Sequence, residues 1–253
     1  MAQYGRVYVN NYEKEKRFKI FQDNVARIEA FNNANDKLHK LGINAFAGLT
    51  NEEFNAKQNR FKGHMCSNNA ISLKYKTVIA VPATVDWRKK RGTPVKDQGQ
   101  CAGTAIEAIH EKTIGKLISL SEQELEGVVG TCNTRKEANS AAQIDGYEDV
   151  LANSETALLK AIANQPISVA IDASGFLSQF YSIGIFTVDC GTNLDHGITV
   201  VGYRVGDGET KYWLVKNSWG TSWDEEGYIR MQRDVSAKEG LYGIAMQASS
   251  PTA

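Results

Sequence analysis

Residues 212–223 read Tyr-Trp-Leu-Val-Lys-Asn-Ser-Trp-Gly-Thr-Ser-Trp, and residues 194–197 before them read Leu-Asp-His-Gly. Each stretch contains or adjoins a short segment rich in β-branched and aromatic residues, which predicts a strand. His196 stands where the first strand begins, and Asn217 stands where the second ends. Because adjacent strand ends can bring side chains together, we expect His196 and Asn217 to meet.

The C-terminal third is predicted to be a β-sheet or barrel. Short segments rich in β-branched and aromatic residues are separated there by Gly and Asp. The predicted strands are residues 167–171, 197–205, 212–216 and 228–233.

The N-terminal part is predicted to begin with an amphipathic helix over residues 11–32. Apolar residues recur there at steps of three and four, namely Phe18, Phe21, Val25, Ile28 and Phe31. Glu13 and Arg17 lie four residues apart and can pair on the exposed face.

A short strand and a second helix should complete this N-terminal unit. Apolar alternation predicts a strand over residues 41–46. Thr50 and Glu53 form a capping box that opens a helix running toward Arg60. The first sixty residues therefore resemble a small helical unit.

The middle of the chain contains a predicted boundary and further helices. Residues 63–80 lack periodicity, which indicates a linker. Ser121 with Glu124 forms another capping box, and Ser154 begins a helix that must stop near Pro166.

Composition excludes several classes of function. Basic and acidic residues balance at 29 each, so we expect no nucleic-acid partner. No apolar run is long enough for a membrane span, and residues 1–8 show no secretory signal. No two of the four cysteines form a Cys-x-x-Cys pair. We therefore expect no metal and no cofactor, while two disulfides or an incomplete set remain open.

His196 and Asn217 could form part of a catalytic site. An imidazole held by an amide oxygen is a suitable general base for a thiol nucleophile. That thiol would belong at a helix N-terminus, where its pKa is lowered. The alternative is that His196 is a structural histidine and Asn217 a turn residue.

The order of motifs then indicates a family. Asp-Gln-Gly-Gln-Cys at 97–101, Leu-Asp-His-Gly at 194–197 and the stretch 212–223 occur here in this order. In these motifs the chain resembles the papain-like cysteine proteases of the plant senescence-associated type. The resemblance implies that His196 is the general base, Asn217 its orienting partner and Gln98 the oxyanion-hole donor. Trp219 would shield the pair from water and contact substrate; the alternative is simple core packing, and the two roles are compatible.

The N-terminal residues resemble the inhibitory propeptide of this family. The matching positions are Glu13, Arg17, Phe21, Asn24, Ile28, Asn32, Gly42, Asn44 and Phe46. Gly48 replaces the usual aspartate, which puts pH-triggered propeptide release in doubt. The other histidines, His39, His64 and His110, match no motif and are expected to be solvated.

The resemblance implies an α+β, two-lobed papain-like fold preceded by a propeptide. The domains would be a propeptide-like unit at 1–62, an activation linker at 63–80 and a peptidase domain at 81–253. The helical lobe of that peptidase domain is expected to be shortened.

The match breaks where the family carries its nucleophile. Counting from Gln98, Cys101 falls on a disulfide cysteine and Thr104 on the nucleophile, and a second block is missing after Leu125. Cys101 could serve only if the shortened loop brings it to the helix start. Tyr242 also replaces a cysteine, so the mature-region disulfides are predicted to be absent. Asp224 replaces a glycine, with a smaller expected effect.

Three functions follow from these observations. The chain would be a cysteine endopeptidase precursor with weak or no activity on peptide or protein substrates. Alternatively, it would be a pseudoenzyme whose propeptide-like helices inhibit other papain-like proteases, or the product of a decayed gene. The resemblance implies a monomer that is secreted, vacuolar or lysosomal, although no leader is visible in this chain.

Overall fold

A computed structural model describes residues 6–34, 37–59, 75, 77–97, 145–188 and 191–252. The helices of this part are α1 (Asn11–Asn33), α2 (Asn51–Gln58), α3 (Arg88–Arg91), α7 (Glu155–Ile162) and α8 (Phe176–Phe180). Its strands are β1 (His39–Leu41), β2 (Val85–Asp86), β3 (Gly146–Asp149), β4 (Ile167–Ile171), β5 (Tyr181–Phe186), β6 (His196–Val205), β7 (Lys211–Lys216), β8 (Tyr228–Gln232) and β9 (Ala248–Thr252). Two short 3-10 turns cover Asp207–Glu209 and Leu241–Gly243.

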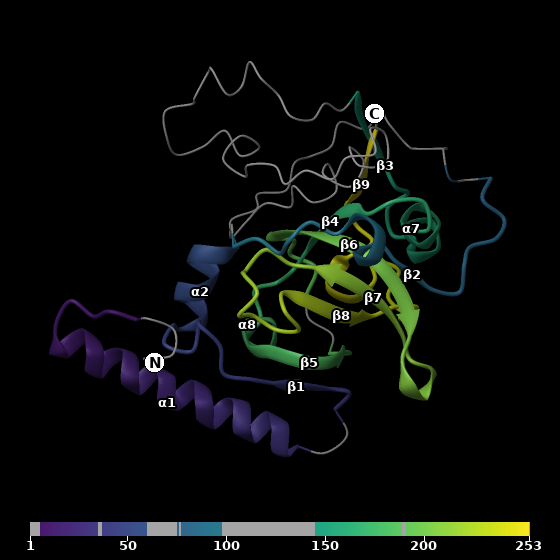
Figure 1. The fold of residues 1–253 in the computed structure, drawn as a ribbon. Helices are drawn as coiled ribbons and strands as arrows, with labels where there is room; N and C mark the ends of the chain where they lie inside the picture. The colour runs from purple at the N-terminus through teal and green to yellow at the C-terminus, as the bar shows by residue number, and fades with distance from the viewer. Residues whose placement is uncertain are drawn as a thin grey trace, which may run out of the picture.

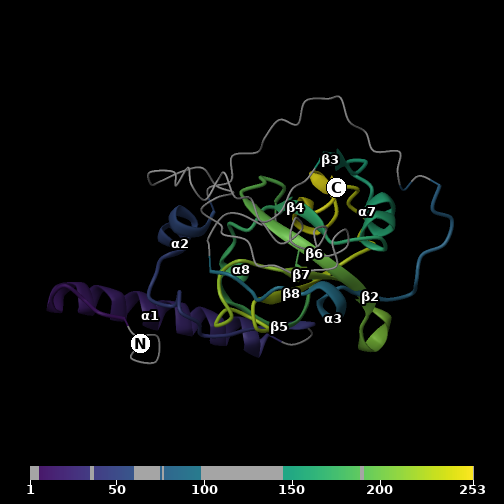
Figure 2. The ribbon, with the colours of Figure 1, turned by 45° about the horizontal axis from the view of Figure 1, so that its top comes forward.

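One sheet organises the described part of the chain. Its strand order is β1-β5-β8-β7-β6-β4-β9-β3, with β2 paired to β6. All neighbouring strands are antiparallel except β5 and β8, which are parallel. The helix α1 lies along the end where β1 pairs with β5, and α7 lies at the other side of the sheet (Figure 1; Figure 2). The predicted α+β fold class is confirmed.

The N-terminal helices form as the sequence predicts. Helix α1 begins at Asn11, and its N-cap Asn10 accepts a hydrogen bond from the backbone N–H of Glu13 at 2.9 Å. Helix α2 opens with the complete Thr50–Glu53 capping box.

Polar residues of α1 hold the following loop in place. The Asn24 side chain donates to the carbonyl oxygens of Ala47 and Leu49 at 2.9 and 3.0 Å. The Asn32 side chain both donates to and accepts from the backbone of Leu41. The buried Asn24 and the partly buried Asn32 thus satisfy backbone groups of the following loop.

The predicted strand over residues 41–46 is wrong in its bounds. The strand is His39–Leu41, and turns follow it because the Asn44 side chain accepts the N–H of Phe46 at 2.9 Å. An asparagine that bonds the backbone two residues ahead favours a turn over an extended chain.

The prediction that His39 is solvated is also wrong. Its side chain is 1% exposed, and its ring centroid lies 4.5 Å from that of Phe186 and 5.1 Å from that of Phe31. β1 pairs with β5 and thereby carries His39 into the aromatic core. His64 and His110 lie outside the described residues.

The C-terminal elements confirm the sequence prediction closely. Ser154 caps α7, and α7 ends before Pro166. The strands predicted at 167–171, 197–205, 212–216 and 228–233 correspond to β4, β6, β7 and β8, each within one residue at either end. The residues of β4 and β7 are almost all buried, so their apolar runs mark central strands.

Several predicted features fall outside the described residues. They include the Ser121–Glu124 capping box, the four cysteines, and most of the linker and helical lobe. Tyr242, which was expected in place of a cysteine, is buried, and its hydroxyl lies 3.3 Å from Ser178 Oγ. No helix in the described segments is long and apolar enough to cross a membrane.

Candidate active site

The sheet brings His196 and Asn217 together. His196 opens β6 and Asn217 follows β7, and these two strands pair with Thr199 opposite Lys216. His196 Nε2 lies 2.8 Å from Asn217 Oδ1. The same Oδ1 accepts the N–H of Ser218 at 2.7 Å, which fixes the amide.

This contact determines which imidazole nitrogen can act as a base. A carboxamide oxygen only accepts hydrogen bonds, so Nε2 carries the proton. Nδ1 is then the basic nitrogen, and it has no hydrogen-bond partner in the described part of the chain. The ring can therefore accept a proton at Nδ1.

Trp219 covers the imidazole. Its ring stacks on His196 with centroids 4.6 Å apart and an interplanar angle of 27°. Trp219 is 2% exposed and contacts the edges of Trp223 and Phe54 at 4.8 and 5.0 Å between centroids. An N-terminal residue, Phe54, thus helps to seal the face of Trp219.

Burial controls the charge of His196. The side chain is fully buried, and this desolvation lowers its pKa to about 4, although the bond to Asn217 acts in the opposite direction. The imidazole is consequently neutral at mildly acidic and neutral pH.

The other predicted site residues lie outside the described residues. These are Gln98, Cys101 and Thr104. The chain just before them is described: Asp97 forms a β-bridge with Trp219, and the Gly220 N–H donates to Lys96 O at 2.9 Å. The segment that leads to Gln98 therefore runs beside Trp219.

The sequence analysis missed two partly buried carboxyl groups with shifted pKa values. Asp195 precedes His196, and burial raises its pKa to about 6 while its Oδ1 accepts the Ala173 N–H at 2.7 Å. Glu155 accepts the indole N–H of Trp213 at 2.9 Å, and burial raises its pKa. Asp195 lies in the loop before β6 and Glu155 in the first turn of α7, and no local sequence pattern distinguishes either one from a surface acid.

The described residues contain no group of three His, Cys, Asp or Glu side chains that could hold a metal ion. The chemistry visible in these segments is that of a neutral, buried imidazole oriented by an amide.

Comparisons with known proteins identify the family. The model of the papain family cysteine proteases matches residues 126–252, and that of the cathepsin propeptide inhibitor domain (I29) matches residues 1–54. The chain belongs to the papain family of cysteine proteases. Its papain-family relatives include the senescence-specific cysteine protease SAG39 of Oryza sativa, with 44% identity covering 100% of this chain and 88% of that protein. SAG12 of Arabidopsis thaliana is 41% identical with the same coverage.

Solved papain-family precursors have the same fold. A recombinant stem bromelain precursor is 36% identical with a TM-score of 0.89, covering 100% of this chain and 96% of that one. The proform of the ragweed pollen allergen Amb a 11 is 35% identical with a TM-score of 0.88, covering 99% and 90%.

The length of one alignment can be compared with the prediction that internal segments of the peptidase domain are missing. The alignment with SAG39 spans 301 positions, whereas this whole chain has 253 residues. At least 48 aligned positions of that relative therefore have no counterpart here, which is consistent with an internally shortened papain-family chain.

Proposed function

We propose that this chain is a zymogen-type papain-like cysteine protease whose own endopeptidase activity is impaired. The family acts on peptide or protein substrates. One observation carries the proposal: a base of the right kind, His196 oriented by Asn217, is assembled, while Thr104 occupies the nucleophile's place in the sequence.

Each site residue has a proposed role. His196 Nδ1 is the general base, Asn217 orients the ring, Trp219 excludes water, and Gln98 is the oxyanion-hole donor. Cys101 is the one candidate thiol nucleophile near this position.

The acidity of the nucleophile explains the impairment. A free cysteine thiol has a pKa of about 8.5 and is ionised readily beside an imidazolium, but an aliphatic alcohol is far less acidic. His196 is itself held neutral by burial. A threonine hydroxyl at position 104 would therefore stay protonated and react slowly.

Alkylation and turnover test this proposal. The full chain is incubated at mildly acidic pH, with and without limited proteolysis of residues 63–80, and assayed with a fluorogenic peptide and a thiol-alkylating active-site probe. We expect no turnover and no labelling that depends on His196. The proposal would be overturned by peptide turnover together with labelling of Cys101. Both signals would have to disappear in His196→Ala and persist in the control Cys190→Ser.

A second candidate function is inhibition of intact papain-like proteases by the N-terminal unit, residues 1–62. Its favouring observation is the way this unit contacts the rest of the chain. Asn44 Nδ2 donates to Gln179 O at 2.7 Å, and Asn55 Nδ2 donates to Ser174 O at 3.0 Å. Backbone oxygens accept both bonds, so a related enzyme with the same backbone path could accept them too.

Titration tests this second function. A peptide of residues 1–62, checked for helicity by circular dichroism, is titrated against an active papain-like enzyme. We expect inhibition at peptide concentrations below about 1 μM, which corresponds to a binding free energy of about −8.2 kcal/mol. Phe54→Ala should weaken inhibition and the exposed Phe18→Ala should not. Absence of inhibition at micromolar peptide dismisses this candidate.

We also propose the domain boundaries 1–62, 63–80 and 81–253 for the propeptide-like unit, the linker and the peptidase domain. A secreted, vacuolar or lysosomal site and a monomeric state are further proposals from the family. A thermal melt with and without reductant tests whether any disulfide contributes. An unchanged cooperative melt is expected, while a melt without cooperativity would favour a decayed gene product.

A further inference from the structure

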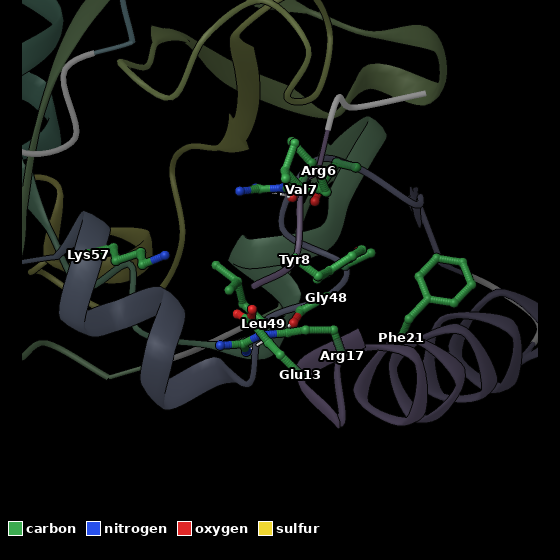
Figure 3. Close-up of a pocket in the computed structure, with 12 residues that line it drawn as sticks. Arg6, Val7, Tyr8, Glu13, Arg17, Phe21, Gly48, Leu49 and Lys57 are labelled. Carbon is green, nitrogen blue, oxygen red and sulfur yellow. Dashed lines mark hydrogen bonds between the residues drawn. The ribbon is translucent and has the colours of Figure 1, made fainter. Parts of the chain in front are cut away.

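A cavity of about 120 Å³ lies within the N-terminal unit and shares no lining residue with the His196–Asn217 pair. It is open to solvent on one side and is lined by the arm at residues 6–8, by α1, by the loop 44–49 and by α2. Figure 3 shows Arg6, Arg17 and Lys57 approaching it from three different segments. The apolar part of its wall comes from Val7, Phe21 and Leu49.

The cationic groups of this cavity are incompletely neutralised. Arg17 donates to Glu53 Oε2 at 2.5 Å and to Gly48 O at 3.2 Å. Among the described residues, the recorded acceptor of the Arg6 side chain is the carbonyl oxygen of Ala45, at 2.6 Å. Within the described residues, Lys57 has no hydrogen bond or ion pair.

The charged groups around the cavity indicate the sign of a ligand's charge. The carboxylates at hand are Glu53, which pairs with Arg17, and Glu13, which accepts the Val9 N–H at 2.8 Å. Cations outnumber carboxylates here, and Lys16, which lowers the pKa of Glu53 together with Arg17, adds to the excess. The cavity therefore favours an anionic ligand, since a neutral ligand would leave the positive charge unpaired.

The shape and lining indicate its chemistry. A water molecule occupies about 30 Å³ of liquid volume, so the cavity holds a group of a few non-hydrogen atoms. Guanidinium and ammonium groups bind carboxylate oxygens by charge-assisted hydrogen bonds. Phe21, Leu49 and Val7 suit a small apolar tail.

We propose that this cavity is a binding site for a small monocarboxylate. The carboxylate is received by Arg6 and Lys57, and its alkyl group faces the apolar wall. Because Arg6 belongs to the N-terminal arm and Lys57 to α2, the bound anion links these segments to α1. Binding therefore stabilises the N-terminal unit as a whole.

Thermal unfolding of the full chain, followed by far-ultraviolet circular dichroism at pH 7, tests the site. Sodium acetate and propionate are compared with sodium chloride and sodium sulfate at equal ionic strength. At about 50 mM, the carboxylates should raise Tm by about 2 to 4 °C above the chloride value. An equal effect of chloride, or a larger effect of sulfate, overturns the proposal.

Variants locate the effect. Arg6→Gln and Lys57→Gln should each remove at least half of the carboxylate response, whereas Lys19→Gln, an exposed α1 lysine outside the cavity, should retain it. Retention of the full response in both cavity variants overturns the assignment. Each replaced side chain is exposed, so the fold should persist, and the circular dichroism spectrum checks this.

A tethered carboxylate gives a second, independent measurement. Gly48 lines the cavity and does not have a positive φ, so an aspartate is compatible with its backbone. Gly48→Asp should raise Tm in chloride alone and abolish the acetate response. A normal acetate response in this variant would show that acetate binds elsewhere and would overturn the proposal.

Discussion

At the scale of single residues, His39 is a base in an environment that opposes its charged form. Neither ring nitrogen has a hydrogen-bond partner in the described chain, and Tyr181 and Phe186 of β5 and Phe31 of α1 surround the ring. Burial, with a smaller effect of Lys37, lowers its pKa to about 4. The Tyr181 hydroxyl turns instead to Gly184 O and Glu225, beside Arg230.

This burial gives a pH-dependent stability. In the unfolded chain His39 has its ordinary pKa of about 6.5, whereas in the folded chain burial lowers that pKa to about 4. The stability that depends on neutral His39 is therefore full above pH 6.5 and declines as pH falls toward 4, by roughly 2 to 3 kcal/mol. His39→Phe should remove this part of the decline, as measured by urea unfolding at pH 7 and pH 4.

The comparison of variant and wild type isolates His39 from other groups. His196 contributes in the same direction, and Asp195 in the opposite one, but both are present in each protein. The prediction would be contradicted if the free energy of unfolding fell between pH 7 and pH 4 by the same amount in His39→Phe as in the wild type.

Asp224 combines an unusual backbone with a buried carboxyl group. Its φ is +66°, its Oδ1 accepts the N–H of Glu225 at 2.7 Å, and its shielded Oδ2 has no partner in the described segments. Burial raises its pKa well above the usual range. Both the positive φ and the ionised carboxylate destabilise the fold.

Asp224→Gly should therefore stabilise the chain by about 1 to 3 kcal/mol at pH 7. Because burial raises the pKa of Asp224 in the folded chain, its carboxyl group destabilises the fold increasingly as pH rises. The stability gained by Asp224→Gly should therefore be smaller in acid. Glu226→Gly is the matched control, since Glu226 is exposed with φ +56° and should give a gain independent of pH. Chemical denaturation at pH 7 and pH 4.5 measures both, and equal pH dependence in the two variants would refute the role of the buried carboxyl.

At the scale of elements, α2 is fixed mainly by one side chain. Phe54 is fully buried and packs edge-on against Phe46 and Trp219, with ring centroids 5.1 and 5.0 Å away. Phe54→Ala should cost about 3 to 5 kcal/mol. Phe18→Ala, on the half-exposed side of α1, should cost below about 1 kcal/mol.

Equilibrium unfolding compares these two variants, and fluorescence quenching reports whether Trp219 becomes accessible. Similar losses of stability in both would mean that α2 does not depend on the contact with Trp219.

The sequence predicts those elements whose signals are local. The stripe of Phe21 and Ile28 defines α1, and the Thr50 box defines the start of α2. The His196–Asn217 contact also follows from two predicted strand ends. By contrast, the burial of His39 depends on Phe186, which lies far along the chain, and β1 is too short for a pattern to fix its register. The shifted pKa values of Asp195 and Glu155 were missed for the same reason, because tertiary packing alone makes these side chains partly buried.

At the scale of the whole molecule, the N-terminal unit shares its core with the C-terminal sheet. Phe46, Leu49 and Phe54 belong to the same buried cluster as Trp219 and Trp223. A second cluster joins Ile28, Leu41 and Ala47 to Phe180, and Arg27 lies 3.7 Å from the centroid of the Phe176 ring. β1 also extends the sheet at β5. The N-terminal unit is therefore joined to the sheet by buried apolar side chains and by strand pairing.

Cleavage of the folded chain tests how far the two parts depend on each other. A site for a specific protease is inserted at residues 66–70, and the chain is cut after folding. Removal of the N-terminal fragment would expose Trp219, its aromatic neighbours and the β5 edge, each apolar side chain costing about 1.5 to 3 kcal/mol. We expect the two fragments to co-elute at pH 7. Residues 71–253 expressed alone should have a Tm at least about 10 °C lower or bind a hydrophobic dye. The Tm estimate uses roughly 2 to 4 °C for each kcal/mol of stability lost. The uncut inserted chain is the control. A separated C-terminal fragment with the Tm of the uncut chain would show instead that the sheet is stable without the helices that cover its histidine.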